Sequence, residues 1–295
     1  MATPQTGIFA QGSRSHRHLE FDLVPGATPE SLRAILGTLH QPSVSAGGAN
    51  IVVGFGADLW RRVTPSIVPD ALGPFPDVDS VPVSQHDLWV WIHGSGEGLM
   101  FDLARGIAAL LSPIATLASE VAGFVYREGR DLTGFIDGTE NPPLEEAFAV
   151  AVVGADEPGA GGSFAITQRW VHDLAAFHAL TVSDQEKVIG RTKADSVELD
   201  DKIKGPRAHI SRVVIEQDGE ELQLWRRSVP YGTVTDHGLF FVAFSADPSR
   251  FEKMLRSMFG QTADGVRDRL TEFSTPAASA AYFVPSFESL AEALA

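Results

Sequence analysis

The densest cluster of polar residues in this 295-residue chain lies at residues 130–142, with the sequence RDLTGFIDGTENP. Gly134 and Gly138 bracket Asp137 within it. Glycines on both sides let the backbone turn sharply and approach a ligand closely, so the carboxylate could face a cavity from a tight loop. The alternative is that Asp137-Gly138 is an ordinary turn signal and nothing more.

One of the nine histidines, His209, differs from the others in its setting. The chain has no H-x-x-x-H or H-E-x-x-H spacing, which argues against a zinc hydrolase. His209 follows residues 205–208 (GPRA), and we expect it to open a strand over 210–216 and point into a cavity. A metal site with one histidine needs a cofactor that supplies the other ligands, as haem does; a structural histidine is the alternative. His16 and His18 flank a charged start and are expected to be exposed.

Arg226 ends an expected strand over 222–227, just before a turn that contains Pro230 and Gly232. Alternation along this strand would place Arg226 on the apolar face with Leu222 and Leu224. A guanidinium in such a row needs a partner or a function. The opposite phase, in which residues 225 and 227 face inward, is equally compatible with the periodicity.

Composition excludes several classes of protein. The formal charge is −15, so the surface repels phosphate backbones and anionic lipid, and we expect no nucleic-acid or membrane partner. Cysteine is absent, which excludes disulfides, thiolate catalysis, cysteine-ligated iron–sulfur clusters and thiolate-ligated haem. No apolar leader and no run of about 18 apolar residues is visible, so a cytoplasmic protein is the expectation.

The elements that must position these residues are predicted in two similar halves. In the first half, strands are expected at 18–24, 50–55, 87–93 and 122–127. One helix is expected to follow Thr28 as its N-cap and to bury Leu32, Ile35, Leu36 and Leu39, and another is expected over 101–117 with a kink at Pro113. The order β-α-β-β-α-β is typical of a ferredoxin-like fold.

The second half repeats this order loosely. Strands are expected at 163–172, 210–216, 222–227, 238–245 and 281–285, and helices at 174–180, 183–189 and from 247 to 258. We therefore predict an α+β protein with two domains, residues 1–147 and 148–295. Sequence identity between the halves is not visible, so this duplication is inferred from element order alone.

Together these segments resemble the dye-decolorising peroxidases, a family of haem peroxidases, and most closely their bacterial B-type group. The strongest match is GFIDGTENP at 134–142. Further blocks that match in order are IGRTK (189–193), RAHISR (207–212), RRSVPYG (226–232) and GLFFVAF (238–244). The resemblance implies a duplicated ferredoxin-like fold of the dimeric α+β barrel type, with antiparallel sheets, peripheral helices and the haem in the second half.

The resemblance also implies roles for individual residues. Asp137 and Arg226 match the catalytic pair on the peroxide side, and His209 matches the ligand of the iron in one haem b per chain. A carboxylate partner for His209 is expected late in the chain, with Asp268 as first choice and Asp264 as second. Ser228 stands where some B-type members have asparagine. The remaining haem contacts are expected at Gly138, Thr139, Arg207, Leu239 and Phe241.

The implied activity is reduction of hydrogen peroxide with one-electron oxidation of small organic reductants such as dyes and phenolics. Arg226 is expected to keep Asp137 ionised by lowering its pKa, which favours an acidic optimum. The family commonly forms homo-oligomers from dimers to hexamers, and some members load into encapsulin shells. The alternatives are a haem-handling protein of the same fold, a chlorite dismutase-like enzyme, and a binding module without a cofactor.

Overall fold

The computed structural model describes residues 2–37, 48–64 and 68–294. Four antiparallel strands of the first half form a sheet in the order β4-β1-β3-β2. They are β1 (Ser15–Leu23), β2 (Ala49–Phe55), β3 (Leu88–Gly94) and β4 (Ala115–Phe124). A short helical turn η1 (Thr6–Ile8) precedes them, and the helices are α1 (Pro29–Leu36), α2 (Ala57–Val63) and α3 (Glu97–Leu111).

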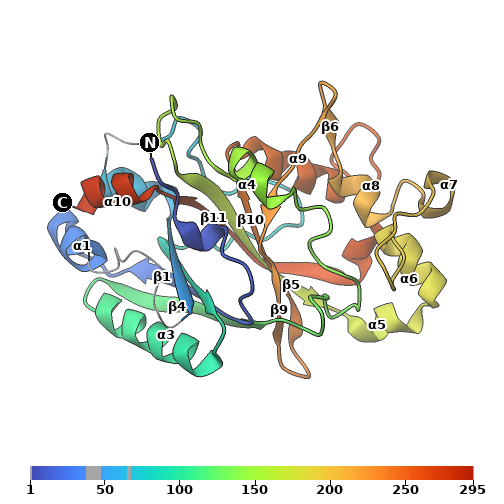
Figure 1. Cartoon of the computed structure of the whole chain (residues 1–295), viewed down its shortest axis with the longest axis horizontal. Coiled ribbons are helices and arrows are strands. Elements are labelled where there is room, and N and C mark those ends of the chain that lie inside the picture. The colour runs from blue at the N-terminus through green and yellow to red at the C-terminus, as the bar shows by residue number, and fades with distance from the viewer. Residues whose placement is uncertain (1, 38–47, 65–67, 295) are drawn as a thin grey trace.

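The second half repeats this order as β11-β5-β10-β9, so that in each half the fourth strand lies at one edge, beside the first strand. These strands are β5 (Ser163–His172), β9 (Val229–Gly232), β10 (His237–Ser245) and β11 (Ser274–Val284), and the two-residue β8 (Trp225–Arg226) also pairs with β10. The helices are α4 (Leu144–Ala151), α5 (Leu174–Ala179), α6 (Val182–Ile189), α7 (Asp201–Lys204), α8 (His209–Val213), α9 (Ser249–Met258), η3 (Arg269–Glu272) and α10 (Phe287–Leu294). Two ferredoxin-like halves were predicted, and the topology agrees (Figure 1).

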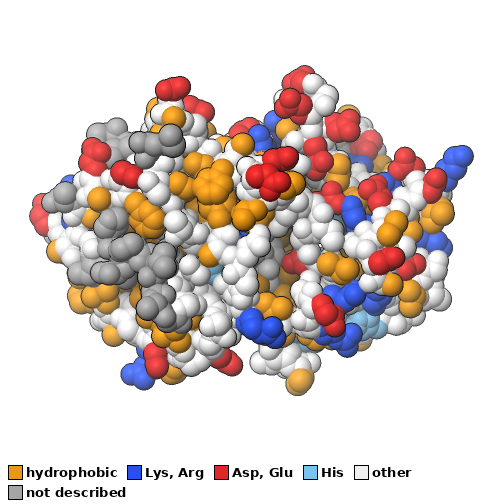
Figure 2. Space-filling model, viewed as in Figure 1, with side chains coloured by type: hydrophobic (Ala, Val, Ile, Leu, Met, Phe, Trp, Pro, Cys, Tyr) orange, Lys and Arg blue, Asp and Glu red, His pale blue; other side chains and the backbone are white. Residues whose placement is uncertain are grey.

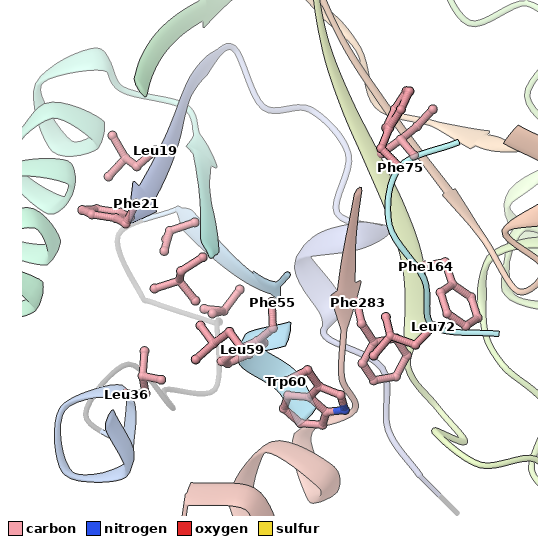
Figure 3. Packing of buried hydrophobic residues seen from close by; sticks show 14 of the residues in the cluster. Leu19, Phe21, Leu36, Phe55, Leu59, Trp60, Leu72, Phe75, Phe164 and Phe283 are labelled. Atoms are coloured by element: carbon pink, nitrogen blue, oxygen red, sulfur yellow. The ribbon is translucent and has the colours of Figure 1, made fainter. Parts of the chain in front are cut away.

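The two sheets meet edge to edge and close into a ring of eight strands. β2 contacts β11 through the pair Phe55 and Phe283, and β4 contacts β9 through Gly123 and Tyr231. Aromatic side chains pack between the sheets, among them the stacked Trp89, Trp91 and Tyr282. A second cluster of buried side chains, part of which Figure 3 shows, packs helices α1 and α2 against the strands.

His16 and His18 lie inside this ring, so the expectation that they are exposed was wrong. Their side chains are 4% and 1% exposed and stack on Trp91. The cause is the position of β1, which pairs with a strand on each side and turns one face toward the other sheet. The charged residues near His16 and His18 in the sequence were therefore a poor guide to the exposure of these two side chains.

In the first half, the helix predicted at 101–117 was misplaced. α3 ends at Leu111, two residues before Pro113, and β4 begins at Ala115. Pro113 therefore lies just beyond the helix and does not kink it, because proline has no amide hydrogen with which to continue the helical hydrogen bonds. The capping of α1 was predicted correctly, because the Thr28 hydroxyl accepts a hydrogen bond from the Ser31 amide. Leu39 lies outside the described residues.

In the second half, the strand predicted at 210–216 is the helix α8 instead. Ile210 is buried and Val213 faces the same cavity as His209, and a spacing of three residues is that of a helix, whereas the β-branched run at 213–215 favours a strand. Of the strand predicted at 222–227, only the two residues of β8 form a strand. β7 (Glu220–Glu221) precedes that range and pairs with β6 (Glu216–Gln217), and the turn between them has Asp218 and Gly219 at positive φ.

Figure 2 shows acidic side chains distributed over one face of the molecule, in keeping with the formal charge of −15. Within the ranges that the structure describes, no helix combines the length and the apolar character needed to cross a membrane.

Candidate active site

A large cavity lies against the outer face of the second sheet. It encloses about 1140 Å³ of empty space, a volume that includes open solvent at its mouth. Alternate residues of β5 and of β10 form its floor, and α8, α9, η3 and the loop at 131–137 surround it. The apolar lining includes Ile166, Trp170, Leu239, Phe241, Leu255, Met258 and Leu270. Such walls suit a broad apolar ligand.

His209 is the first residue of α8 and lines this cavity. Its Nδ1 lies 2.7 Å from Oδ2 of Asp268, a residue with no exposed surface. The other oxygen of Asp268 accepts a hydrogen bond from the Leu270 amide at 2.8 Å and caps η3. A carboxylate held in this way fixes Nδ1 as the protonated nitrogen of His209 and leaves the lone pair of Nε2 available.

Asp264, the second choice for this partner, pairs with a different residue. Its carboxylate accepts hydrogen bonds from Arg212 at 2.8 and 3.3 Å. Arg212 is itself on α8, so this ion pair holds the helix that carries His209, but it does not contact the imidazole.

α8 is also fixed by a close approach of α6. Gly190 ends α6 in the left-handed conformation, with φ 94°. A Cβ at this position would lie 2.3 Å from Cγ2 of Ile210. Only glycine therefore allows both the backbone turn and the contact with the residue that follows His209.

Asp137 reaches the cavity from the loop that the two glycines shape. Gly134 and Gly138 both have positive φ, at 90° and 72°. The Asp137 amide donates to the carbonyl of Gly129 at 3.1 Å, and its Oδ1 accepts the Gly138 amide at 2.7 Å. The accessible surface of the side chain faces the cavity, with protein atoms around it. The turn and the cavity-facing carboxylate are therefore both present.

The pKa of Asp137 is raised to about 6, first by burial among protein atoms and next by the negative charge of Asp131. Arg226, the Gly138 amide and His209 act in the opposite direction but do not outweigh these causes. The expected lowering of this pKa by Arg226 was therefore wrong in its net direction, because the sequence did not reveal the loss of hydration or the second carboxylate.

Arg226 lines the cavity, which decides between the two phases left open for its strand. Its amide donates to Oδ1 of Asn141 at 2.8 Å, and Nδ2 of Asn141 donates to the Arg226 carbonyl at 2.8 Å. Asn141 thus ties β8 to the loop of Asp137. The neighbouring Trp225 and Arg227 point to the opposite side, where both donate to the carbonyl of Ile8.

The other predicted haem contacts divide into two groups. Leu239 and Phe241 line the cavity. Gly138, Thr139 and Arg207 are not among its lining residues in the part of the chain described, and Arg207 instead pairs with Glu272 on the surface. Ser228 is also absent from the lining, and its hydroxyl accepts a hydrogen bond from the Val242 amide at 3.3 Å.

Six polar residues that line the cavity were not predicted from the sequence. They are Asp131, Thr133, Gln168, His172, Thr271 and Ser274. The only signal in the sequence was that Asp131 and Thr133 belong to the same polar cluster as Asp137. Among the described residues, no three histidines or carboxylates gather into a metal site of their own. A metal bound by His209 would therefore need a cofactor that supplies its other ligands.

Comparison with known proteins agrees with this geometry. The family models described as Dyp-type peroxidase, N-terminal, and Dyp-type peroxidase, C-terminal, match residues 35–125 and 128–289. A dye-decolorizing peroxidase of Rhodococcus erythropolis is 38% identical over 255 residues, which are 84% of this chain and 75% of the relative.

Two solved structures are similar over nearly the whole chain. A variant of DypB from Rhodococcus jostii RHA1 in complex with heme has a TM-score of 0.88 at 33% identity and covers 98% of both chains. The encapsulated DyP-type peroxidase from Mycobacterium smegmatis has a TM-score of 0.89 at 30% identity, over 99% of this chain and 98% of its own. Family models, relatives and folds therefore agree, and this chain belongs to the Dyp-type peroxidase family.

Proposed function

We propose that His209 would bind the iron of a haem b in the cavity, and that Asp137 and Arg226 act on hydrogen peroxide there. The chain is a haem-dependent peroxidase of the Dyp type. The observation that carries the residue assignment is the hydrogen bond from His209 to the buried Asp268, on a cavity that Asp137 and Arg226 also line.

The residues of the cavity fit this cofactor. The apolar side chains of β10 and α9 would contact a flat macrocycle, and His209 would offer Nε2 to its iron. The carboxylate of Asp268 makes the imidazole a stronger electron donor. When bound, haem supplies the iron that accepts electrons from organic reductants and passes them to peroxide.

With haem bound, Asp137 would accept a proton from hydrogen peroxide and return it to the oxygen that leaves as water. It can do so near neutrality, because its pKa of about 6 leaves it ionised but still ready to accept a proton. Arg226 stabilises the negative charge that grows on the leaving oxygen as the O–O bond breaks. Asn141 holds Arg226 in place through two backbone hydrogen bonds.

Small organic reductants such as dyes and phenolics would restore the resting enzyme in one-electron steps. We further propose a homo-oligomer, from dimer to hexamer, and an encapsulin shell as partner, which would place the chain in a cytoplasmic compartment. The similarity to the encapsulated peroxidase of M. smegmatis supports the shell. The two units proposed are residues 1–147 and 148–295, with α4 spanning the connection.

The test is haem titration of the purified wild-type chain and of His209→Ala, followed by one equivalent of hydrogen peroxide. Wild type should give a histidine-ligated Soret band that shifts with peroxide and recovers with a phenol. His209→Ala should lose most of its haem, because the protein's bond to the iron is gone. His178→Ala is the matched control, since His178 is exposed. A normal Soret band in His209→Ala would overturn the ligand assignment, and a wild-type band that peroxide leaves unchanged would favour a haem-handling protein.

A further inference from the structure

A second polar cluster lines the cavity beside the residues assigned above. It consists of Asp131 and Thr133 from the loop, His172 at the end of β5, and Ser274 at the start of β11. The side chains of Asp131 and His172 are 15% and 5% exposed. Buried polar groups are retained only where hydrogen bonds compensate the loss of water, so the bonds of this cluster indicate what it does.

Asp131 is held as a carboxylate on both of its oxygens. Oδ2 accepts the amide of Thr133 at 2.9 Å and the hydroxyl of Thr133 at 2.5 Å, and Oδ1 lies 3.1 Å from Nε2 of His172. Burial works to raise the pKa of Asp131, but these hydrogen bonds outweigh it and the pKa is lowered. A negative charge is therefore kept in the wall of the cavity.

His172 can serve this carboxylate in either of its charge states. Nε2–H donates to Asp131, and Nδ1 lies 2.8 Å from the hydroxyl of Ser274. A neutral His172 accepts the hydrogen of that hydroxyl, and a protonated one donates to its oxygen, because a serine hydroxyl is both donor and acceptor. Only the Ser274 hydroxyl has to rotate between the two states. The hydrogen bond from Nε2 of His172 to Asp131 is therefore kept whether His172 is neutral or protonated.

The backbone keeps Asp131 and Asp137 in one short ladder. Arg130 and Ile136 form an antiparallel bridge. The Asp131 amide donates a hydrogen bond to the Phe135 carbonyl at 2.9 Å, and the Asp137 amide donates one to the Gly129 carbonyl. In the described ranges, four other charged or titratable groups line the same cavity as Asp137, namely Asp131, His172, His209 and Arg226. Of these, Asp131 alone opposes ionisation of Asp137.

We propose that Asp131, held by Thr133 and His172, is a positioning residue that sets the proton affinity of Asp137. This inference rests on the proposed role of Asp137 in moving the peroxide proton. Without Asp131, burial alone would oppose the attraction of Arg226, and Asp137 would become a weaker base. A proton acceptor is most effective when its pKa lies near the working pH, and the fixed charge of Asp131 brings Asp137 toward that range.

The experiment is an infrared titration of the haem-loaded protein in wild type, Asp131→Asn and His172→Gln. Protonated carboxyl groups absorb separately from carboxylates, and the band of Asp137 is the one that Asp137→Asn removes. Asp131→Asn should lower the titration midpoint of that band by about half a pH unit or more, as expected when a nearby like charge is removed. Asparagine can keep the Thr133 bonds, and His172 can change tautomer to accept its amide.

His172→Gln is the matched control, because glutamine keeps a donor to Asp131 and leaves the charge of Asp131 in place. Its midpoint should not fall. A midpoint that Asp131→Asn leaves unchanged would overturn the inference, and so would an equal fall in both variants, since disturbed packing would then explain it. Asp131→Ala replaces Asp131→Asn if that variant does not fold, with the same criteria. The titration midpoint does not depend on catalysis. If Asp131→Asn lowers the midpoint of the Asp137 band but leaves the pH dependence of the peroxide reaction unchanged, the role of Asp137 is refuted and that of Asp131 is not.

Discussion

Nδ1 of His209 lies 2.7 Å from Oδ2 of Asp268, which has no exposed surface and also caps η3 through its other oxygen. The carboxylate thus joins the start of α8 to the start of η3, two segments that are 59 residues apart. Its negative charge makes the imidazole a stronger electron donor and therefore favours the oxidised state of a bound iron.

Asp268→Asn should raise the midpoint potential of the ferric/ferrous couple, because an amide cannot supply that charge. Haem affinity or activity should fall about 10–100-fold, the usual cost of losing such a partner. Spectroelectrochemical titration measures the potential. Asp264→Asn is the control, since Asp264 pairs with Arg212 and not with His209. An unchanged potential in Asp268→Asn would show that this hydrogen bond does not tune the ligand.

Asp137→Asn and Arg226→Leu should both retain haem, since neither residue is the proposed ligand of the iron. At least one of them should slow the reaction with peroxide by ~10²-fold or more, the scale of a lost proton transfer or a lost stabilising charge. Stopped-flow loss of the resting Soret band gives the rate. Thr139→Ala, in the same motif but not in the cavity lining, is the control. Rates close to wild type in both variants would refute the proposed mechanism.

The peroxide reaction should lose rate as the pH falls through about 6. Asp137 must be ionised to accept a proton, and its pKa of about 6 means that the active form predominates above this pH and is lost below it. Arg226→Leu should move this acidic limb to higher pH, because the guanidinium lowers the pKa of Asp137. Arg226→Lys, which keeps the charge, should move it less. Rates measured from pH 4.5 to 8 test this, and a rate that rises as the pH falls below 6 would exclude Asp137 as the base.

Most of the strand order could be predicted because short apolar runs rich in β-branched and aromatic residues, such as residues 50–55 and 238–245, favour strands. α8 was missed because the β-branched run at 213–215 favours a strand, although the spacing of residues 210 and 213 suits a helix. The resemblance located His209, Asp137 and Arg226 by their motifs. Asp131 was missed because its role depends on a hydrogen bond to His172, 41 residues away, and the pKa of Asp137 could not be predicted without it.

Gly190 should matter for the iron ligand although it does not line the cavity. In Gly190→Ala the left-handed backbone of an L-residue costs about 1 kcal/mol, and the new Cβ, which would lie 2.3 Å from Cγ2 of Ile210, forces α8 to move. We therefore expect a lower melting temperature together with weaker haem binding. Gly219→Ala is the control: it has a similar φ of 86°, and its Cβ would meet nothing within 4 Å. If both variants lose stability equally and bind haem as wild type does, the contact between α6 and α8 does not position His209.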